Sequence, residues 1–121
     1  MERDPTFTAR YDELGLRQLL RDAEVYLERI ASSVATNRTI YPAEWADWVA
    51  PLYRRRRVPM DDLISIGEGL RGSVRAFLGP DEMAVVNVAI DEAVRIFRWN
   101  RRIAGDARKR NRILQFFYKG A

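Results

Sequence analysis

The side chains that most often perform acid–base or nucleophilic chemistry are missing from this sequence. It contains no histidine and no cysteine, which excludes imidazole bases, thiol nucleophiles and disulfides, together with cysteine- or histidine-based zinc, iron–sulfur and haem sites. Its serines have no imidazole to activate them, and no glycine-rich phosphate-binding motif occurs. We therefore expect a protein that is not an enzyme and that binds no cofactor.

Two adjacent acidic pairs are the remaining candidates for metal chemistry, Asp61-Asp62 and Asp91-Glu92. Neighbouring residues on a helix are about 100° apart, so the two carboxylates of each pair diverge. Neither pair resembles the Glu-x-x-His element of a carboxylate di-metal bundle. No metal site is expected.

Aromatic residues offer a candidate ligand pocket. A concave site for a small apolar or planar ligand is usually lined by aromatic side chains with a few polar groups. Aromatic residues at helical spacing also form ordinary core, and the sequence leaves both interpretations open. The candidate pocket residues are Trp45, Trp48, Phe77 and Trp99.

Positive charge is concentrated at the C-terminal end. The formal net charge is +4, but residues 1–94 hold 12 arginines against 16 acidic residues, and residues 95–121 hold nine basic residues against Asp106 alone. This asymmetry suggests an acidic partner or a nucleic acid. The candidate contacts are Arg101, Arg102, Arg108, Lys109, Arg110 and Arg112.

These basic residues nearly surround a helix instead of forming one stripe, which is typical of a solvated stalk. No compact helix-turn-helix unit with a recognition helix is apparent. Nucleic-acid binding through the C-terminal segment is therefore kept as the alternative function and is not favoured.

Helical periodicity dominates the 121 residues, a length that fits one domain. Apolar residues recur at three- and four-residue steps, and prolines at 42, 59 and 80 separate the segments. The predicted helices span about 11–37 and 43–57, then a third that follows Val58-Pro59, has Asp61 and Asp62 in its first turn and ends at about 78, and a fourth over about 81–118. No strand is predicted, so the expected fold is all-α, with four long helices in a globin-like or four-helix-bundle arrangement and no sheet.

The last predicted helix has an unusually wide apolar face, which must cover more than one neighbour. One of its rows is a candidate packing or dimer face and consists of Met83, Val86, Ile90, Val94 and Phe97. We expect a homodimer that forms through this helix. In the preceding helix, Gly67 and Gly69 suggest a close approach between helices.

An unbroken helix from residue 81 to 118 would measure about 57 Å, against about 35 Å for a globule of this size. Part of it should therefore project or break, and Asn100–Asp106, which includes Gly105, is the expected place. We accordingly divide the chain into a sensor and dimerisation domain, 1–105, and a basic C-terminal extension, 106–121, that starts a linker to an output domain.

No segment of the sequence predicts a signal peptide or a membrane-spanning helix. The N-terminal residues are charged and lack the apolar segment of a signal peptide, and nowhere do 18 apolar residues follow one another. We expect a cytoplasmic protein with no membrane partner.

The stretch from Arg54 to Arg71, RRRRVPMDDLISIGEGLR, resembles the N-terminal sensor domains of RsbR/RsbRD-type stressosome co-antagonists and PucR-like transcriptional regulators. In those domains a basic helix end precedes a Val-Pro-Leu-acidic-acidic-Leu segment, and a final helix leads into the next domain. Helix order and spacing match from about residue 11 to 104.

This resemblance implies a non-catalytic sensory and dimerisation module of bacterial signalling, stress response or transcription regulation, with a non-haem globin-like fold. Haem sensing is not carried over because the sequence has no proximal histidine. The implied partners are a second copy and a downstream output domain or signalling protein. Residues 106–121 lie outside the resemblance.

Overall fold

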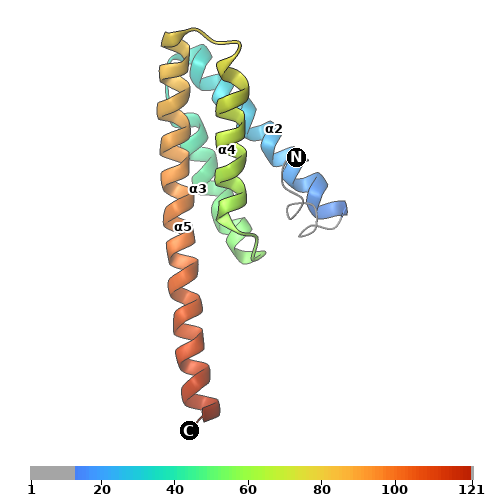
Figure 1. Ribbon diagram of the computed structural model, residues 1–121, viewed down its shortest axis with the longest axis vertical. Coiled ribbons are helices and arrows are strands. Elements are labelled where there is room, and N and C mark those ends of the chain that lie inside the picture. Colours follow the sequence, from blue (N-terminus) through green and yellow to red (C-terminus); the bar gives the residue numbers. More distant parts are fainter. Residues whose placement is uncertain (1–12, 121) are drawn as a thin grey trace.

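The computed structural model describes the backbone of residues 13–120 and the side chains of residues 13–103. It contains four helices, α2 (Glu13–Thr36), α3 (Ile40–Arg55), α4 (Met60–Arg75) and α5 (Pro80–Gly120) (Figure 1). No strand occurs in this part of the chain. The predicted all-α fold with four helices and no sheet is confirmed.

α5 is the common neighbour of the other helices. It packs extensively against α3 and α4 and also contacts α2, whereas α4 has few contacts with α2 or α3. In Figure 1, α3, α4 and α5 run along the long axis of the molecule, and α2 crosses them obliquely. This central position explains the wide apolar face of α5.

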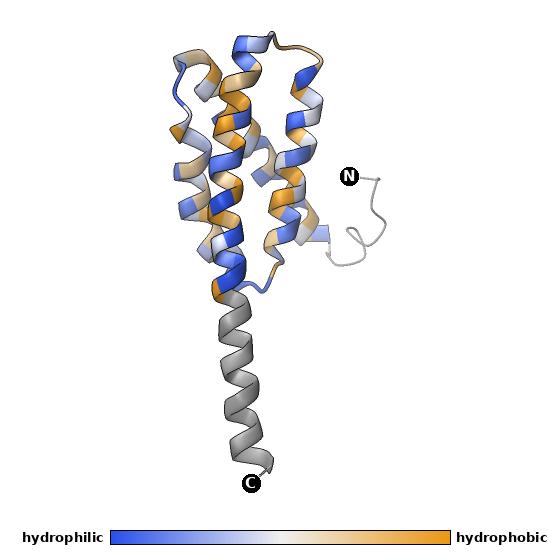
Figure 2. Ribbon diagram, turned by 60° about the vertical axis from the view of Figure 1, so that its left-hand side comes forward, coloured by the Kyte–Doolittle hydropathy of each residue, from blue (hydrophilic) through white to orange (hydrophobic). Residues whose placement is uncertain are grey.

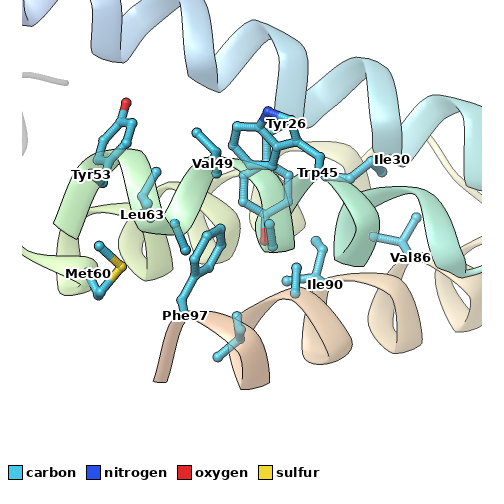
Figure 3. Packing of buried hydrophobic residues seen from close by; sticks show 14 of the residues in the cluster. Tyr26, Ile30, Trp45, Val49, Tyr53, Met60, Leu63, Val86, Ile90 and Phe97 are labelled. Atoms are coloured by element: carbon cyan, nitrogen blue, oxygen red, sulfur yellow. The ribbon is translucent and has the colours of Figure 1, made fainter. Parts of the chain in front are cut away.

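The core forms where the helices turn their apolar rows toward one another. Hydrophobic and hydrophilic residues alternate along the helices, as amphipathic helices require (Figure 2). The rings of Tyr26, Trp45 and Phe97 meet at the centre of the core (Figure 3), with centroids 5.0 Å apart for Tyr26–Trp45 and 6.2 Å for Trp45–Phe97. Such aromatic pairs contribute about 0.5–1.5 kcal/mol each beyond the burial of their surface.

The row that was a candidate for dimerisation is a packing face within one chain. Its five residues are no more than 9% exposed, and all of them belong to the buried core: Met83, Val86, Ile90, Val94 and Phe97. A second chain could reach them only if α5 separated from its neighbours. The expectation of a dimer through this row is therefore corrected, because α2, α3 and α4 already cover it.

α5 projects and does not break. It is continuous from Pro80 to Gly120, 41 residues, which corresponds to a length of about 62 Å. Its C-terminal part extends beyond the other helices (Figure 1). A single internal glycine costs only about 1 kcal/mol relative to alanine, so Gly105 does not interrupt the helix between Asn100 and Asp106.

Helices α2 and α3 end in the same way, which the sequence did not predict. Asn37 and Arg57 have positive φ angles of 55° and 61°, and the residue after each donates its backbone N–H to a carbonyl five positions earlier, Arg38 to Ser33 at 3.1 Å and Val58 to Tyr53 at 3.0 Å. This is the Schellman pattern, which usually has glycine at the left-handed position. The predicted ends at about residues 37 and 57 lie within two residues of the observed ends, but without glycine the sequence did not reveal the motif that forms them.

One of the two predicted close approaches is present. A Cβ atom at Gly67 would lie 2.6 Å from the hydroxyl oxygen of Tyr26, whereas a Cβ at Gly69 would meet nothing within 4 Å. The Tyr26 hydroxyl is buried and has no hydrogen-bond partner in the part of the chain that the structure describes. Burial raises the pKa of Tyr26 well above its ordinary value, so the phenol stays protonated. Only Gly67 therefore brings α4 against α2.

Gly67→Ala and Gly69→Ala should change stability in opposite directions. At Gly67 the added methyl group collides with a packed ring, and we expect a loss of about 1–3 kcal/mol. At Gly69 the space is open, and alanine should add up to about 1 kcal/mol through its helix propensity. Urea unfolding followed by circular dichroism measures both, and equal effects at the two positions would contradict the close packing of Tyr26.

Candidate ligand groove between α2 and α3

A groove of about 550 Å³ lies between α2 and α3, within the usual range for small-molecule sites. Its lining residues are Gln18, Arg21, Asp22, Val25 and Arg29 from α2, Tyr41, Glu44, Trp45, Trp48, Val49, Leu52 and Tyr53 from α3, and Arg56. On each helix these positions repeat at three- and four-residue steps, so each wall is one helix face. We call this site the α2–α3 groove.

A buried polar contact joins the two walls. The Tyr53 hydroxyl of α3 donates a hydrogen bond to the Asp22 carboxylate of α2, and the Gln18 side-chain amide donates to the same carboxylate at 3.2 Å. Both Asp22 and Tyr53 are buried. Hydrogen bonds to charged groups contribute about 1.5–3 kcal/mol, so this contact fixes the spacing of the walls.

Two tryptophans of α3 have different roles in the α2–α3 groove. Trp48 is 68% exposed and offers a free aromatic face at the rim. Trp45 is buried, and its ring contacts both Tyr26 and Phe97, the latter edge-on at an interplanar angle of 85°. Trp45 therefore belongs to a groove wall and to the core contact with α5 at once (Figure 3).

The rim of the α2–α3 groove is basic. Arg21, Arg29 and Arg56 are exposed, and none of them forms a salt bridge with another residue whose side chain the structure describes. Glu44 is the one exposed carboxylate in the lining. Guanidinium groups beside an aromatic face can bind a planar anion by stacking and by paired hydrogen bonds.

The four aromatic residues predicted to form a pocket do not come together. Trp45 and Trp48 line the α2–α3 groove. Trp99 lies on α5, where it lines a different hollow, and Phe77 is exposed in the turn between α4 and α5. The expected four-residue pocket is corrected to a pair of tryptophans, because Trp99 lies on α5 and Phe77 lies in the turn after α4, and neither lines this groove.

The second hollow, of about 430 Å³, lies between α4 and α5 and is also basic. Its lining residues are Glu68, Asp91, Val94, Arg95, Arg98, Trp99 and Arg102. The guanidinium of Arg102 lies 5.9 Å from the centre of the Trp99 ring, a cation–π contact. Both tryptophan sites are thus flanked by arginines.

The predicted basic contacts fall into two groups. Arg101 forms an ion pair with Asp61 of α4, and Arg102 borders the second hollow. The side chains of the other four lie outside the described residues: Arg108, Lys109, Arg110 and Arg112.

Arg71 forms the main polar connection between α4 and α5. Its guanidinium donates to Asp91 at 2.6 Å, to Asn87 at 3.0 Å and to Glu68 at 3.0 Å. Burial lowers the pKa of Arg71, but the hydrogen bonds to Asp91 and Glu68 raise it by more, so the group stays charged. Sequence reasoning missed this cluster because Asn87 and Asp91 lie 16 and 20 residues away, beyond any helical repeat.

The described residues include no group of three or more acidic side chains placed to hold a metal ion. None of the helices, as far as they are described, is long and apolar enough to span a membrane.

Comparison of the chain with protein-family models, with curated proteins and with solved structures finds no match.

Tyr53→Phe should destabilise the protein by about 1–3 kcal/mol, because it removes a hydrogen bond from the buried Asp22 carboxylate and leaves that charge less well solvated. Tyr41→Phe, at a half-buried position of the same groove, is the matched control and should cost less than about 0.5 kcal/mol. Thermal and urea unfolding measure both. Equal losses for the two variants would show that the Asp22–Tyr53 contact does not hold the walls together.

Proposed function

We propose that this chain is a non-catalytic sensor module: a planar anionic molecule binds in the α2–α3 groove, and binding changes the packing of α5. The observation that carries the proposal is the position of Trp45. Its ring borders the groove on one side and contacts Phe97 of α5 on the other. A ligand that moves or immobilises this ring acts directly on the central helix.

The chemistry of the lining supports a ligand that is both aromatic and negatively charged. Trp48 provides a free face for stacking, and Arg21, Arg29 and Arg56 provide positive charge without competing salt bridges among the described side chains. A carboxylate, sulfonate or phosphate on a flat ring system satisfies both requirements. A purely apolar ligand would leave the guanidinium groups unused.

The architecture supports transmission through α5. This helix contacts the three others and continues beyond them without a break. A helix is stiff over this length, so a small rotation or shift within the bundle displaces its far end. A ligand changes such an equilibrium only as far as it binds one packing arrangement better than the other.

This function is the one implied by the resemblance of Arg54–Arg71 to RsbR/RsbRD- and PucR-type sensor domains. Under the proposal the protein works in the cytoplasm as a homodimer of the non-haem globin-like kind. It passes its signal to an output domain or a partner signalling protein in bacterial stress response or transcription regulation. The four-helix fold and the groove are compatible with that role.

Naphthalene-2-carboxylate is a suitable probe, since it is flat, aromatic and anionic. Titration into the full chain should change tryptophan fluorescence and give saturable binding. Trp48→Ala should weaken binding about tenfold or more, because it removes the stacking surface, and Arg29→Ala should also weaken it. Trp99→Ala, the matched change at another exposed tryptophan, should leave affinity unchanged.

If Trp48→Ala and Trp99→Ala have equal effects, the α2–α3 groove is not the binding site. Naphthalene without the carboxylate is the ligand control and should bind more weakly than the acid. Equal affinity for both would contradict the role of the arginines.

Coupling between the groove and α5 is tested by hydrogen exchange measured by mass spectrometry. The saturating probe should slow amide exchange in the part of α5 around Phe97 as well as in α2 and α3. Protection confined to α2 and α3 would contradict a transmitted signal, even if the probe binds.

Nucleic-acid binding is the second candidate function, and one observation favours it. Arg95, Arg98 and Arg102 line the same hollow beside Trp99, and guanidinium groups with an exposed aromatic ring can hold a phosphate backbone. Electrostatic binding to generic duplex DNA should weaken steeply with salt. Fluorescence anisotropy at several salt concentrations measures this, with Arg95→Ala/Arg98→Ala as the weakened variant; absence of binding at low salt would exclude this function.

A further inference from the structure

The outer surface of α2 carries a second apolar row beside the one that enters the core. The core row contains Leu19, Tyr26 and Ile30, all nearly inaccessible to solvent. The second row lies about 80–100° around the helix, and Leu20 and Leu27 within it are 42% and 41% exposed. We call this set the outer row of α2: Leu16, Leu20, Ala23 and Leu27.

Charged residues follow one edge of the outer row in a definite order. Arg17 and Arg21 occupy its N-terminal half, and Glu24 and Glu28 its C-terminal half. All four are exposed and border one hollow together with Leu20. Among described side chains, Arg17 pairs with Glu13 at 2.7 Å, and no salt bridge joins the other three to a partner.

Two parts of this order are unfavourable within a single helix. Residues four apart lie next to each other on a helix surface, and like charges at that spacing repel. Arg17 and Arg21 are one such pair, and Glu24 and Glu28 are another. Arg17 also pairs with Glu13, and Arg21 lies three residues from Glu24, so these contacts within the helix are favourable. A second surface with the opposite order of charges compensates the two like-charged pairs as well.

A second copy of α2 in the antiparallel direction presents that opposite order. The midpoint between Arg17 and Glu28 is also the midpoint between Arg21 and Glu24, and it lies half a residue from Ala23. A two-fold axis near Ala23 therefore sets both arginines of one copy against the glutamates of the other. Leu20 and Leu27 are centred half a residue on the other side of Ala23, so the leucines pair across the same axis.

We propose that the outer row of α2 is a homodimer interface in which two α2 helices pack antiparallel about a two-fold axis at Ala23. The inference rests on the homodimer included in the proposed function and names its surface. The small side chain at the axis lets the two helices approach closely. The contact is isologous, as expected for a two-fold dimer: Arg17 of each copy faces Glu28 of the other, so both copies use the same surface.

The position of α2 leaves room for this partner. Its N-terminal half stands away from α4 (Figure 1), and α2 has few contacts with that helix. Its 24 residues extend about 36 Å, so the charged and apolar positions from Arg17 to Glu28 occupy its middle. A partner of one charge sign would meet attraction along half of this edge and repulsion along the other half, whereas a second copy matches all of it.

Sedimentation velocity of the full chain, over a range of concentrations, tests the interface. The unchanged protein should form a dimer, and Leu20→Lys/Leu27→Lys should be monomeric under the same conditions because each copy would place two charges in the apolar row. Leu14→Lys is the matched control: it is an exposed leucine of the same helix outside the row, and its dimer should persist. Circular dichroism verifies that all variants are folded.

A charge swap tests the antiparallel geometry without removing apolar surface. Arg17→Glu and Glu28→Arg should each weaken the dimer about tenfold or more, since each creates two repulsive pairs per dimer. The double variant R17E/E28R restores opposite charges across the axis and should recover the original dimer affinity. A parallel pair, or another protein bound at this surface, would show no such recovery.

A monomer at several hundred micromolar, or a dimer insensitive to the changes at Leu20 and Leu27, would overturn the proposal. Titration of naphthalene-2-carboxylate into the same variants separates this outcome from a failure of the sensor function. None of Arg17, Leu20, Leu27 and Glu28 lines the α2–α3 groove. Probe binding without dimerisation would therefore refute the interface alone, and dimerisation without probe binding would refute the ligand site alone.

Discussion

The contact between Tyr26, Trp45 and Phe97 is the interaction on which the rest of the structure depends. These rings come from α2, α3 and α5 and meet in the middle of the core. Their size sets the distances between three helix axes at one level of the molecule. α4 then reaches the same level only because Gly67 has no side chain to collide with the Tyr26 ring.

Two polar contacts fix how neighbouring helices lie against each other, which apolar packing alone does not determine. The Asp22–Tyr53 hydrogen bond sets α2 against α3, and the guanidinium of Arg71 connects α4 with Asn87 and Asp91 of α5. Both contacts require their partners in place, because removing one partner leaves a buried or half-buried charged group without its hydrogen bond. Among the described side chains, the buried hydroxyls of Tyr26 and Ser33 have no hydrogen-bond partner. These unsatisfied groups lower the stability margin at the centre of the fold.

The proposed sensor and the proposed dimer use different sides of α2, and Arg21 lies where the two sides meet, since it lines the α2–α3 groove and also borders the outer row. One side borders the α2–α3 groove, with Asp22 and Arg29, and the opposite edge holds Leu20 and Leu27. A ligand that changes how α2 lies on α3 would therefore also reorient the dimer contact. In that arrangement α2 receives the signal and α5 carries it away, with Trp45 between them.

The sequence by itself determined the number and type of the elements. Each helix depends on apolar residues three or four apart, and prolines lie near the starts of the last three, so periodicity predicted four helices and no sheet. Local patterns also predicted that α5 would either project or break, without deciding between the two, and they indicated Gly67 and Gly69 equally as close approaches, of which only Gly67 is one. They could not assign Arg71 its partners, because Asn87 and Asp91 are far from it in the chain. They also could not show that Leu20 and Leu27 of α2 stay exposed, because exposure depends on where the neighbouring helices cross.

Only the tertiary structure decided which aromatic residues are buried in the core and which are exposed. Trp45 and Trp48 are three residues apart on one helix, yet the first is buried against Phe97 and the second is largely exposed. The same holds for the apolar row of α5, which the sequence left open as a packing face or a dimer face and which the fold buries within one chain. The physical reason is that helical spacing sets which residues share a face, whereas burial depends on where the neighbouring helices cross.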